Sequence, residues 1–180
     1  MKDYRKFVSK LSLPYLGTPQ EAIPRIFKTL NEKFNLKHNS SQQLIDLGSG
    51  NGRIVIFSAI NYGIKSVGIE IDENLIEETY EAIKSLKREK KICRKLTKLI
   101  EIRNEDLFMQ NLQNYDFIYI FSLPSMQKSL NHVLITAKTD AIVISFKYKL
   151  KGFESYLHYE YCLQIKHNIN LLNVYFYKKQ

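Results

Sequence analysis

Cysteine and histidine are scarce in this 180-residue chain, and their placement argues against a metal centre or a disulfide framework. The two cysteines, Cys93 and Cys162, lie far apart and neither belongs to a CxxC motif. The four histidines are scattered without the spacing that is typical of metal ligands. We therefore expect no metal site and two reduced thiols that pack as small apolar groups.

Long apolar stretches are also lacking. No run approaches the roughly 20 residues that a helix needs to cross a bilayer, so no transmembrane segment is predicted. Residues 1–10 carry charges without an apolar segment behind them, which argues against a secretory signal. There is no internal repeat, low-complexity segment or linker. We expect one globular, cytoplasmic domain, because a chain of this length can bury a sizeable core.

Acidic residues are outnumbered, since 27 lysines and arginines against 18 aspartates and glutamates give a net charge of +9. Such an excess favours acidic partners, such as RNA, an acidic protein or a membrane surface. Much of it lies between Lys84 and Lys98, which is either a solvated helix end and loop or a surface that docks an acceptor. Because no aromatic residue is interleaved there, the stretch does not indicate a platform for stacking bases.

Short apolar runs alternate with segments of helical periodicity, which is typical of a layered α/β domain with a mainly parallel sheet. Three segments are predicted to be helical after a first helix near the N-terminus: 52–61, 73–90 and 125–138. Five short runs are predicted to be parallel strands: 43–47, 66–71, 99–103, 116–121 and 141–146. The tail should add a hairpin at the sheet edge, made of 156–165 and 171–177. The sheet would then have seven strands, with helices on both faces.

The first helix is expected to begin with a capping box. Thr18 would be the N-cap and Pro19 the first helical residue, while Glu21 would reach back to the N-cap. Pro24 should either kink this helix or delay its start, because proline lacks a backbone N–H donor.

The most informative segment covers residues 44–53, with the sequence LIDLGSGNGR. An apolar strand ends there in an acidic residue, and three alternating glycines precede a helix. Glycine is needed where the backbone turns sharply and a ligand approaches closely. In an open α/β sheet, this first turn lies at the edge where the parallel strands end, which is where ligands bind. The segment therefore predicts a binding site.

The glycine pattern and Asp46 discriminate between possible ligands. A dinucleotide fingerprint would read G-x-G-x-x-G, but Gly48 and Gly50 are followed by Arg53 at the third position. A carboxylate at Asp46 would repel a pyrophosphate and attract a cation. S-adenosylmethionine carries an α-ammonium and a sulfonium at that end and no phosphate. The charge therefore favours a methyl donor over a nicotinamide cofactor.

Two more acidic residues follow later strands. Glu70 ends the second strand, where a carboxylate can accept hydrogen bonds from both ribose hydroxyls. NAD enzymes share that requirement, so Glu70 alone does not discriminate. Asp106 follows the third strand and either binds the adenine amino group, with Leu107 or Phe108 near the base, or caps a helix. Carboxylates at the ends of three successive strands together favour a bound methyl donor.

Residues 46–53 resemble motif I of class I S-adenosylmethionine-dependent methyltransferases. Three stretches also resemble a narrower group, the small protein-lysine methyltransferases of archaea and their mitochondrial relatives. Residues 15–19 (YLGTP) stand where those enzymes have an aromatic-Val-Pro-Thr-Pro segment, although Leu-Gly replaces Val-Pro. Residues 53–55 (RIV) follow motif I as in that group, and 121–126 (FSLPSM) resemble the mitochondrial branch. The resemblance extends to about Phe146.

The resemblance implies a Rossmann-like class I methyltransferase fold in a single domain. Residues 1–40 would form an N-terminal helical lid and substrate segment, 41–150 the cofactor-binding core and 151–180 the C-terminal hairpin. S-adenosylmethionine would be the cofactor, and lysine side chains of proteins the acceptors. The expected cofactor-binding residues are Thr18, Asp46, Gly48, Ser49, Gly50, Asn51, Glu70, Ile71, Asp106, Leu107 and Phe121. The expected catalytic residues, around the acceptor slot, are Tyr15, Phe121, Ser122 and Pro124.

An RNA methyltransferase is the alternative, and the basic stretch favours it. Against it, residues 122–125 lack the leading Asn or Asp and the aromatic residue that adenine-amino methyltransferases carry after the fourth strand. The two-cysteine arrangement of 5-methylpyrimidine enzymes is also absent. A non-catalytic donor-binding module is a third interpretation, which the intact glycines and acidic residues disfavour. The acceptor's identity and the oligomeric state stay open.

Overall fold

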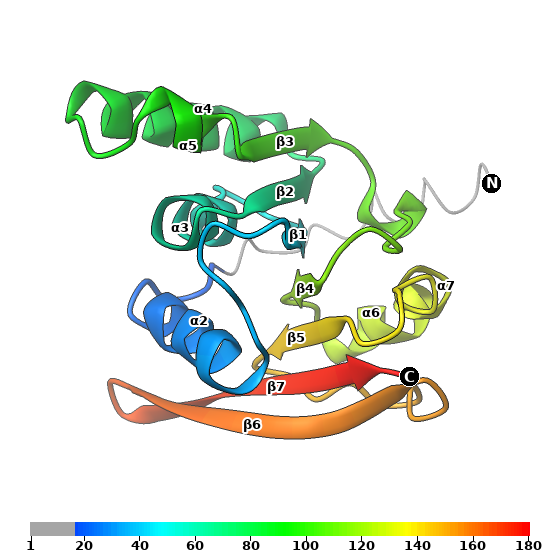
Figure 1. Cartoon of the computed structure of the whole chain (residues 1–180). Coiled ribbons are helices and arrows are strands. Elements are labelled where there is room, and N and C mark those ends of the chain that lie inside the picture. Colours follow the sequence, from blue (N-terminus) through cyan, green and yellow to red (C-terminus); the bar gives the residue numbers. More distant parts are fainter. Residues whose placement is uncertain (1–16) are drawn as a thin grey trace.

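A seven-stranded sheet organises the chain in the computed structural model, which describes residues 17–180 (Figure 1). The strands are β1 (Gln43–Leu47), β2 (Lys65–Glu70), β3 (Ile100–Asn104), β4 (Phe117–Ile120), β5 (Ile142–Phe146), β6 (Leu157–His167) and β7 (Asn170–Lys179). Their order is β3-β2-β1-β4-β5-β7-β6, and the first five strands are parallel. β7 runs antiparallel to β5 and β6. This arrangement confirms the predicted fold class, including the C-terminal hairpin at the sheet edge.

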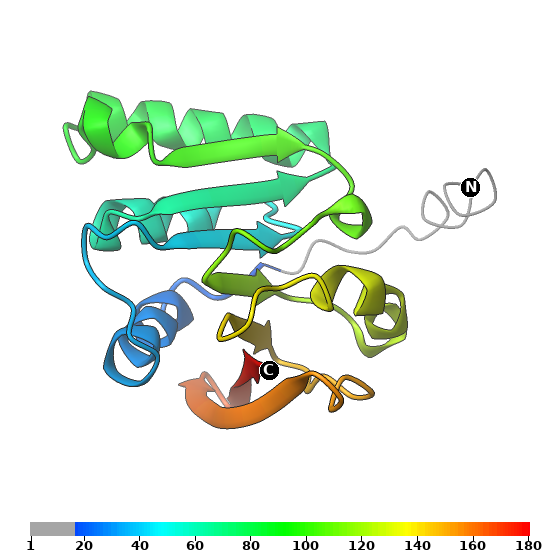
Figure 2. The same ribbon diagram turned by 45° about the vertical axis from the view of Figure 1, so that its right-hand side comes forward.

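Helices cover both faces of the sheet (Figure 2). They are α2 (Ala22–Lys33), α3 (Arg53–Tyr62), α4 (Glu73–Arg88), α5 (Arg94–Thr97), η1 (Leu107–Met109), α6 (Pro124–Gln127), η2 (Lys128–Leu130) and α7 (Asn131–Leu134). Side chains of α2 and α3 pack on one face, and those of η1 and α7 pack on the other. β4 shows the alternation that this requires: Phe117 and Tyr119 face the first layer, Ile118 and Ile120 the second. No helix among residues 17–180 combines the length and apolar character needed to cross a bilayer.

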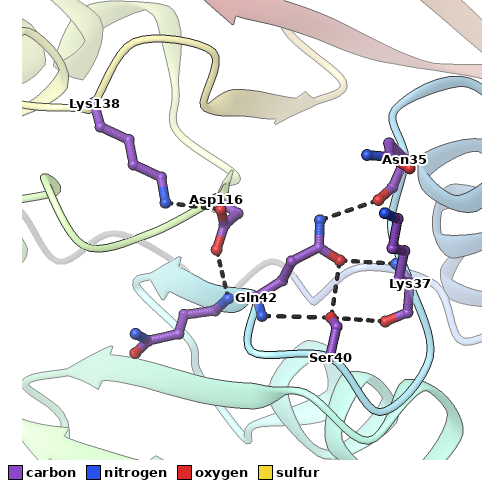
Figure 3. A network of polar contacts seen from close by, with 7 residues as sticks. Asn35, Lys37, Ser40, Gln42, Asp116 and Lys138 are labelled. Carbon is purple, nitrogen blue, oxygen red and sulfur yellow. Dashed lines mark hydrogen bonds and ion pairs between the residues drawn. The ribbon is translucent and has the colours of Figure 1, made fainter.

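The edge where the parallel strands begin is held by Asp116. One of its carboxylate oxygens accepts the backbone N–H of Gln43 at 2.7 Å, and the other pairs with the Lys138 ammonium at 2.7 Å (Figure 3). These bonds join the starts of β1, β4 and β5. They fix the register that places Asp46 beside Tyr119 at the far end of the strands.

The predicted capping box is wrong. α2 begins at Ala22, and its N-cap, Glu21, makes no capping hydrogen bond with its side chain. The Thr18 hydroxyl instead shares a hydrogen bond with the Tyr119 hydroxyl. The late start expected from Pro24 is confirmed, because at the third helical position its missing N–H falls among those that have no partner in a first turn.

The single helix predicted over 125–138 is broken into α6, η2 and α7. Its end is explained by Thr136, whose hydroxyl donates to the Val133 carbonyl at 2.7 Å and accepts the Leu112 N–H at 2.8 Å. Such side-chain bonds offer the backbone an alternative to the helix. The packing predicted for both thiols is also wrong in part, since Cys162 is half-buried but Cys93 is exposed.

Candidate donor site and active site

The loop between β1 and α3 is fixed by backbone contacts to β2 and by close packing against α4. The N–H groups of Gly48 and Ser49 both donate to the Ile69 carbonyl at 2.9 Å. Gly52 is the N-cap of α3 and has a φ of 73°, in the left-handed region. A Cβ at Gly52 would lie 2.3 Å from Cγ2 of Thr79. Only glycine therefore fits this position, for both backbone and packing reasons.

A second glycine with a packing role, Gly68, was missed by the sequence reasoning. It lies inside β2, and a Cβ there would approach the Ser49 hydroxyl oxygen to 2.6 Å. Because Gly68 has no Cβ, the loop that carries Ser49 can pack directly against β2. A glycine in the middle of a strand is the signal that could have identified it, because such a glycine often marks a close approach of another segment.

Glu70 binds the loop from the end of β2. Its Oε2 accepts the Gly50 N–H at 2.7 Å, while Oε1 accepts the N–H groups of Ile71 at 2.8 Å and Asp72 at 3.0 Å. A carboxylate offers about four acceptor positions. One position is then left for a ribose hydroxyl, and a second hydroxyl bond requires one of these amide bonds to be displaced. Ile71, the next residue in the chain, has an exposed side chain.

Asp46 is the most unusual charge in the site, because its side chain is only 3% exposed. Burial, and secondarily the charge of Glu70, raise the pKa of Asp46 well above its usual range. Among residues 17–180, Asp46 takes part in no ion pair. A bound cation would offset both effects, because an opposite charge favours the ionised carboxylate.

Tyr119 joins the N-terminal segment to the site, which the sequence reasoning did not foresee. Its buried hydroxyl lies 2.6 Å from the Thr18 hydroxyl, and both side chains are less than a tenth exposed. Burial raises the pKa of Tyr119, with the Thr18 hydrogen bond opposing and the nearby charge of Asp46 adding to the rise. Thr18 is therefore anchored beside the end of β1. Tyr15, the predicted wall of the acceptor slot, lies outside the described residues.

Removing either hydroxyl of this pair should destabilise the protein. Thr18→Val or Tyr119→Phe leaves the other hydroxyl buried without a partner, which costs about 1–2 kcal/mol of unfolding free energy. The double variant should lose less than the sum of the two, because no orphaned hydroxyl remains. Urea denaturation measures all three. Tyr80→Phe, at a half-exposed position, is the control and should change little. Simple additivity would show that the hydrogen bond contributes nothing.

Asp106 is the N-cap of η1, which is one of the two roles predicted for it. Its Oδ1 accepts the Phe108 N–H at 2.9 Å. Leu107 faces the glycine loop, since its Cδ2 would lie 3.6 Å from a Cβ on Gly48. The structure therefore brings the segment after β3 against motif I. A contact of Asp106 with adenine remains a prediction.

The residues after β4 lie in a small aromatic cluster. The half-buried Phe121 ring packs edge-on against Phe146 at 5.0 Å between centroids, and lies 6.3 Å from the Tyr148 ring. Ser122 is buried and Pro124 is exposed at the start of α6. Within residues 17–180, the hydroxyls of Ser49, Ser58 and Ser122 are buried without a hydrogen-bond partner. Because buried polar groups are normally paired, Ser49 in the glycine loop and Ser122 after β4 are candidates to meet a polar ligand.

The basic stretch from Lys84 to Lys98 lies away from this site. It covers the end of α4 and α5 and stops just before β3, so it occupies the edge where the parallel strands begin. In Figure 1 the connection from α4 to α5 lies at the left, whereas β2 and β3 point to the right. The structure does not place this stretch beside the residues that follow β4, and both predicted roles, a solvated helix end and a docking surface, stay predictions.

The parallel sheet with a reversed β7, the glycine loop after β1 and the carboxylates that end β1 and β2 define a class I S-adenosylmethionine-dependent methyltransferase. The model of one family, the ANTKMT methyltransferase domain, matches residues 46–156, and the chain belongs to that family. The predicted class and cofactor are thereby confirmed. Asp46, Glu70 and the hydroxyls of Ser49 and Ser122 suit the cationic, hydroxyl-rich S-adenosylmethionine.

Three known proteins illustrate the relationships. The chain is 25% identical over 141 residues to a lysine N-methyltransferase of Caenorhabditis elegans that is named for an ATP synthase component, covering 78% of this chain and 70% of that protein. It is 24% identical over 143 residues to a protein-lysine N-methyltransferase of Saccharolobus islandicus, covering 78% and 80%. A crystal structure of an RNA methyltransferase from Salinibacter ruber, in complex with S-adenosyl-L-homocysteine, has a TM-score of 0.73 at 24% identity, covering 91% and 94%. That last likeness is one of fold.

Proposed function

We propose that this methyltransferase transfers the methyl group of S-adenosylmethionine to lysine side chains of proteins. The observation that carries the proposal is the aromatic cluster of Phe121, Phe146 and Tyr148, which closely follows the ends of β4 and β5. This cluster would form the apolar wall of an acceptor slot. The names of two relatives, both lysine methyltransferases, support the same acceptor. The expected cytoplasmic location belongs to this proposal and rests on the sequence alone.

S-adenosylmethionine, when bound, supplies a methyl carbon attached to a positively charged sulfur. Asp46 would hold its ammonium end and Glu70 its ribose, with the hydroxyls of Ser49 and Ser122 as further partners. A neutral lysine nitrogen would take that methyl group, the electrons of the carbon–sulfur bond would stay on sulfur, and the nitrogen would release a proton to solvent.

The chain's own contribution is alignment and desolvation. Holding the nitrogen and the methyl group in line is worth up to about 7–11 kcal/mol in favourable cases. A lysine must also be neutral to react, although its reference pKa is about 10.4. An apolar slot disfavours the charged form and lowers that pKa. The rings around Phe121 would supply this environment.

Phe121→Ala is expected to reduce turnover by about a hundredfold, because a small misplacement of the acceptor has an effect of that size. Steady-state kinetics with a saturating donor measures the change, and calorimetry shows whether the donor still binds. Ile135→Ala, a truncation at an exposed position of α7's end, is the control and should leave turnover unchanged. Unchanged turnover in Phe121→Ala, with donor binding intact, would show that the slot lies elsewhere.

The acceptor class can be tested with S-adenosylmethionine that carries a radioactive methyl group. The full chain is incubated with a lysate of the source cells, and the products are divided between protease and nuclease. Label that only protease releases supports a protein acceptor. Label that only nuclease releases would contradict the proposal and establish RNA methylation, the second candidate function, which the net charge of +9 favours.

A further inference from the structure

The segment that follows β5 brings lysines to the proposed active site. β4 and β5 are parallel, and Ile120 lies opposite Ser145 in their register. Phe121 and Phe146 therefore come next to each other where the two strands end. Residues 147–151, here called the lysine loop, continue from Phe146 at the same edge of the sheet as motif I.

The lysine loop presents its charges on one side by strict alternation. Lys147, Lys149 and Lys151 are exposed, whereas Tyr148 is half-buried and Leu150 is 2% exposed. The chain bends at Lys147 and Tyr148, and with Tyr148 and Leu150 packed inward the three lysine side chains lie at the surface.

Hydrogen bonds from β7 and α6 hold this conformation. The Lys147 N–H donates to the Asn173 carbonyl at 2.7 Å, and the Leu150 N–H donates to the Tyr177 hydroxyl at 2.8 Å. The Gln127 side chain of α6 donates to the Lys149 carbonyl at 3.1 Å. Lys147 itself has a φ of 68°, a conformation that glycine or asparagine adopts more easily. A lysine therefore occupies a position whose backbone conformation disfavours that residue type.

The loop also contacts the acceptor slot directly. Tyr148 is the residue whose ring lies 6.3 Å from that of Phe121. Gln127, which binds the Lys149 carbonyl, belongs to the helix that begins two residues after Ser122. Lys147 directly follows the end of β5 beside this cluster, whereas the Lys149 ammonium extends to the Tyr159 ring of β6.

The three ammonium groups are available to a partner. Among residues 17–180, none of them forms an ion pair. Lys147 lies over the Tyr148 ring at 5.4 Å and Lys149 over the Tyr159 ring at 4.9 Å, contacts that orient a cation without neutralising it. Backbone hydrogen bonds are the main reason why the pKa of the exposed Glu154 carboxyl is lowered, and the charge of Lys149 adds to this, so Glu154 offsets part of the positive charge.

We propose that the lysine loop docks the acceptor protein and selects target lysines that have acidic residues beside them. This rests on the proposed function and names its substrate class. Acidic side chains on both sides of the target would pair with Lys147 and Lys149.

The test uses two fluorescent peptides that share one central lysine and differ only in having glutamate or glutamine on either side of it. Binding to the full chain is measured by anisotropy with S-adenosylhomocysteine present. We expect the glutamate peptide to bind about tenfold more tightly, because each exposed ion pair contributes modestly. The Lys147→Gln/Lys149→Gln variant should lose this preference. Lys87→Gln/Arg88→Gln, which removes the same charge at the opposite edge, should keep it.

Salt provides a second measure, since raising it from about 0.1 M to 1 M shortens the Debye length from about 10 Å to 3 Å and should abolish the preference. Equal affinities for the two peptides, or a preference that survives Lys147→Gln/Lys149→Gln, would overturn the proposal. It would also be overturned if a single-stranded RNA bound more tightly than the glutamate peptide and the same variant released it. The proposed function is tested separately by the radiolabel experiment. If the proposed function fails, protease releases no label from the products.

Discussion

Asp46→Asn is expected to weaken binding of S-adenosylmethionine by at least about thirtyfold, because it removes one partner of a buried charge pair. The same substitution should stabilise the donor-free protein at neutral pH. Asp46 is buried without an ion pair among the described residues, and burial is the main reason why its pKa is raised. An asparagine has no charge to desolvate. The variant should therefore melt at a higher temperature while binding the donor poorly.

The raised pKa of Asp46 also predicts how the stability of the donor-free protein depends on pH. In the unfolded chain an aspartate ionises near pH ~3.9, whereas the pKa of Asp46 in the folded protein is well above that value. The native state binds the extra proton, so its stability falls as the pH rises from the unfolded pKa to the folded one. In Asp46→Asn this decrease in stability with rising pH should be absent.

Differential scanning calorimetry and titration calorimetry measure the two effects separately. Asp140→Asn removes the same charge from an exposed carboxyl that pairs with Lys178, and should change stability by no more than about 1 kcal/mol. Unchanged donor affinity in Asp46→Asn would contradict the role of Asp46 as the partner of the donor's cationic end.

Gly52→Ala is expected to reduce the free energy of unfolding by about 2–5 kcal/mol and to abolish donor binding. An alanine in the left-handed region costs about 1–2 kcal/mol. Overpacking against Thr79 adds about 1–3 kcal/mol, because the new Cβ would lie 2.3 Å from Cγ2 of that side chain. The strain would move the loop that carries Gly48 and Ser49.

Gly152→Ala is the matched control for this prediction. Gly152 has a φ of 86°, and no atom lies within 4 Å of a Cβ placed there. Gly152→Ala should therefore show only the free-energy cost of placing an alanine in the left-handed region. Thr79→Ala should restore part of the stability lost in Gly52→Ala, since it removes the methyl group that clashes. Equal losses for Gly52→Ala and Gly152→Ala in urea denaturation would show that the contact with Thr79 is unimportant.

The parts of the fold that followed from the sequence have local signals. Apolar periodicity predicted β1 to β5 and the C-terminal hairpin, and glycines with flanking acidic residues predicted the donor loop. These patterns involve residues close together in the chain, where spacing and geometry are directly linked. The fold class and the cofactor were predicted correctly for this reason, whereas the methyltransferase family followed from the resemblance of short motifs to a known group.

The errors and omissions involve contacts between distant segments. Thr18 has the sequence pattern of an N-cap, yet its hydroxyl pairs with Tyr119, 101 residues away. Thr79 is fully buried against Gly52 although a threonine on a helix predicts nothing of the kind. Tertiary packing decided both positions, and a single sequence does not record which side chains meet across a sheet. The lysine loop was missed likewise, because only the pairing of β4 with β5 brings it to Phe121.

Donor recognition and acceptor recognition make opposite electrostatic demands on this site. Asp46 and Glu70 provide negative charge where a cationic donor would lie, while the lysine loop provides positive charge where the acceptor would enter. This division would let one edge of the sheet bind a cationic donor and an acidic acceptor segment.

The most direct test of lysine methylation is amino-acid analysis of the labelled product. Protein labelled by this enzyme from radioactive S-adenosylmethionine is hydrolysed completely, and the amino acids are separated against methylated standards. The proposed function predicts that the label elutes with N-methylated lysine, and that Phe121→Ala reduces its amount. Label that elutes with methylated arginine or histidine, or that is found only in nucleosides, would contradict it.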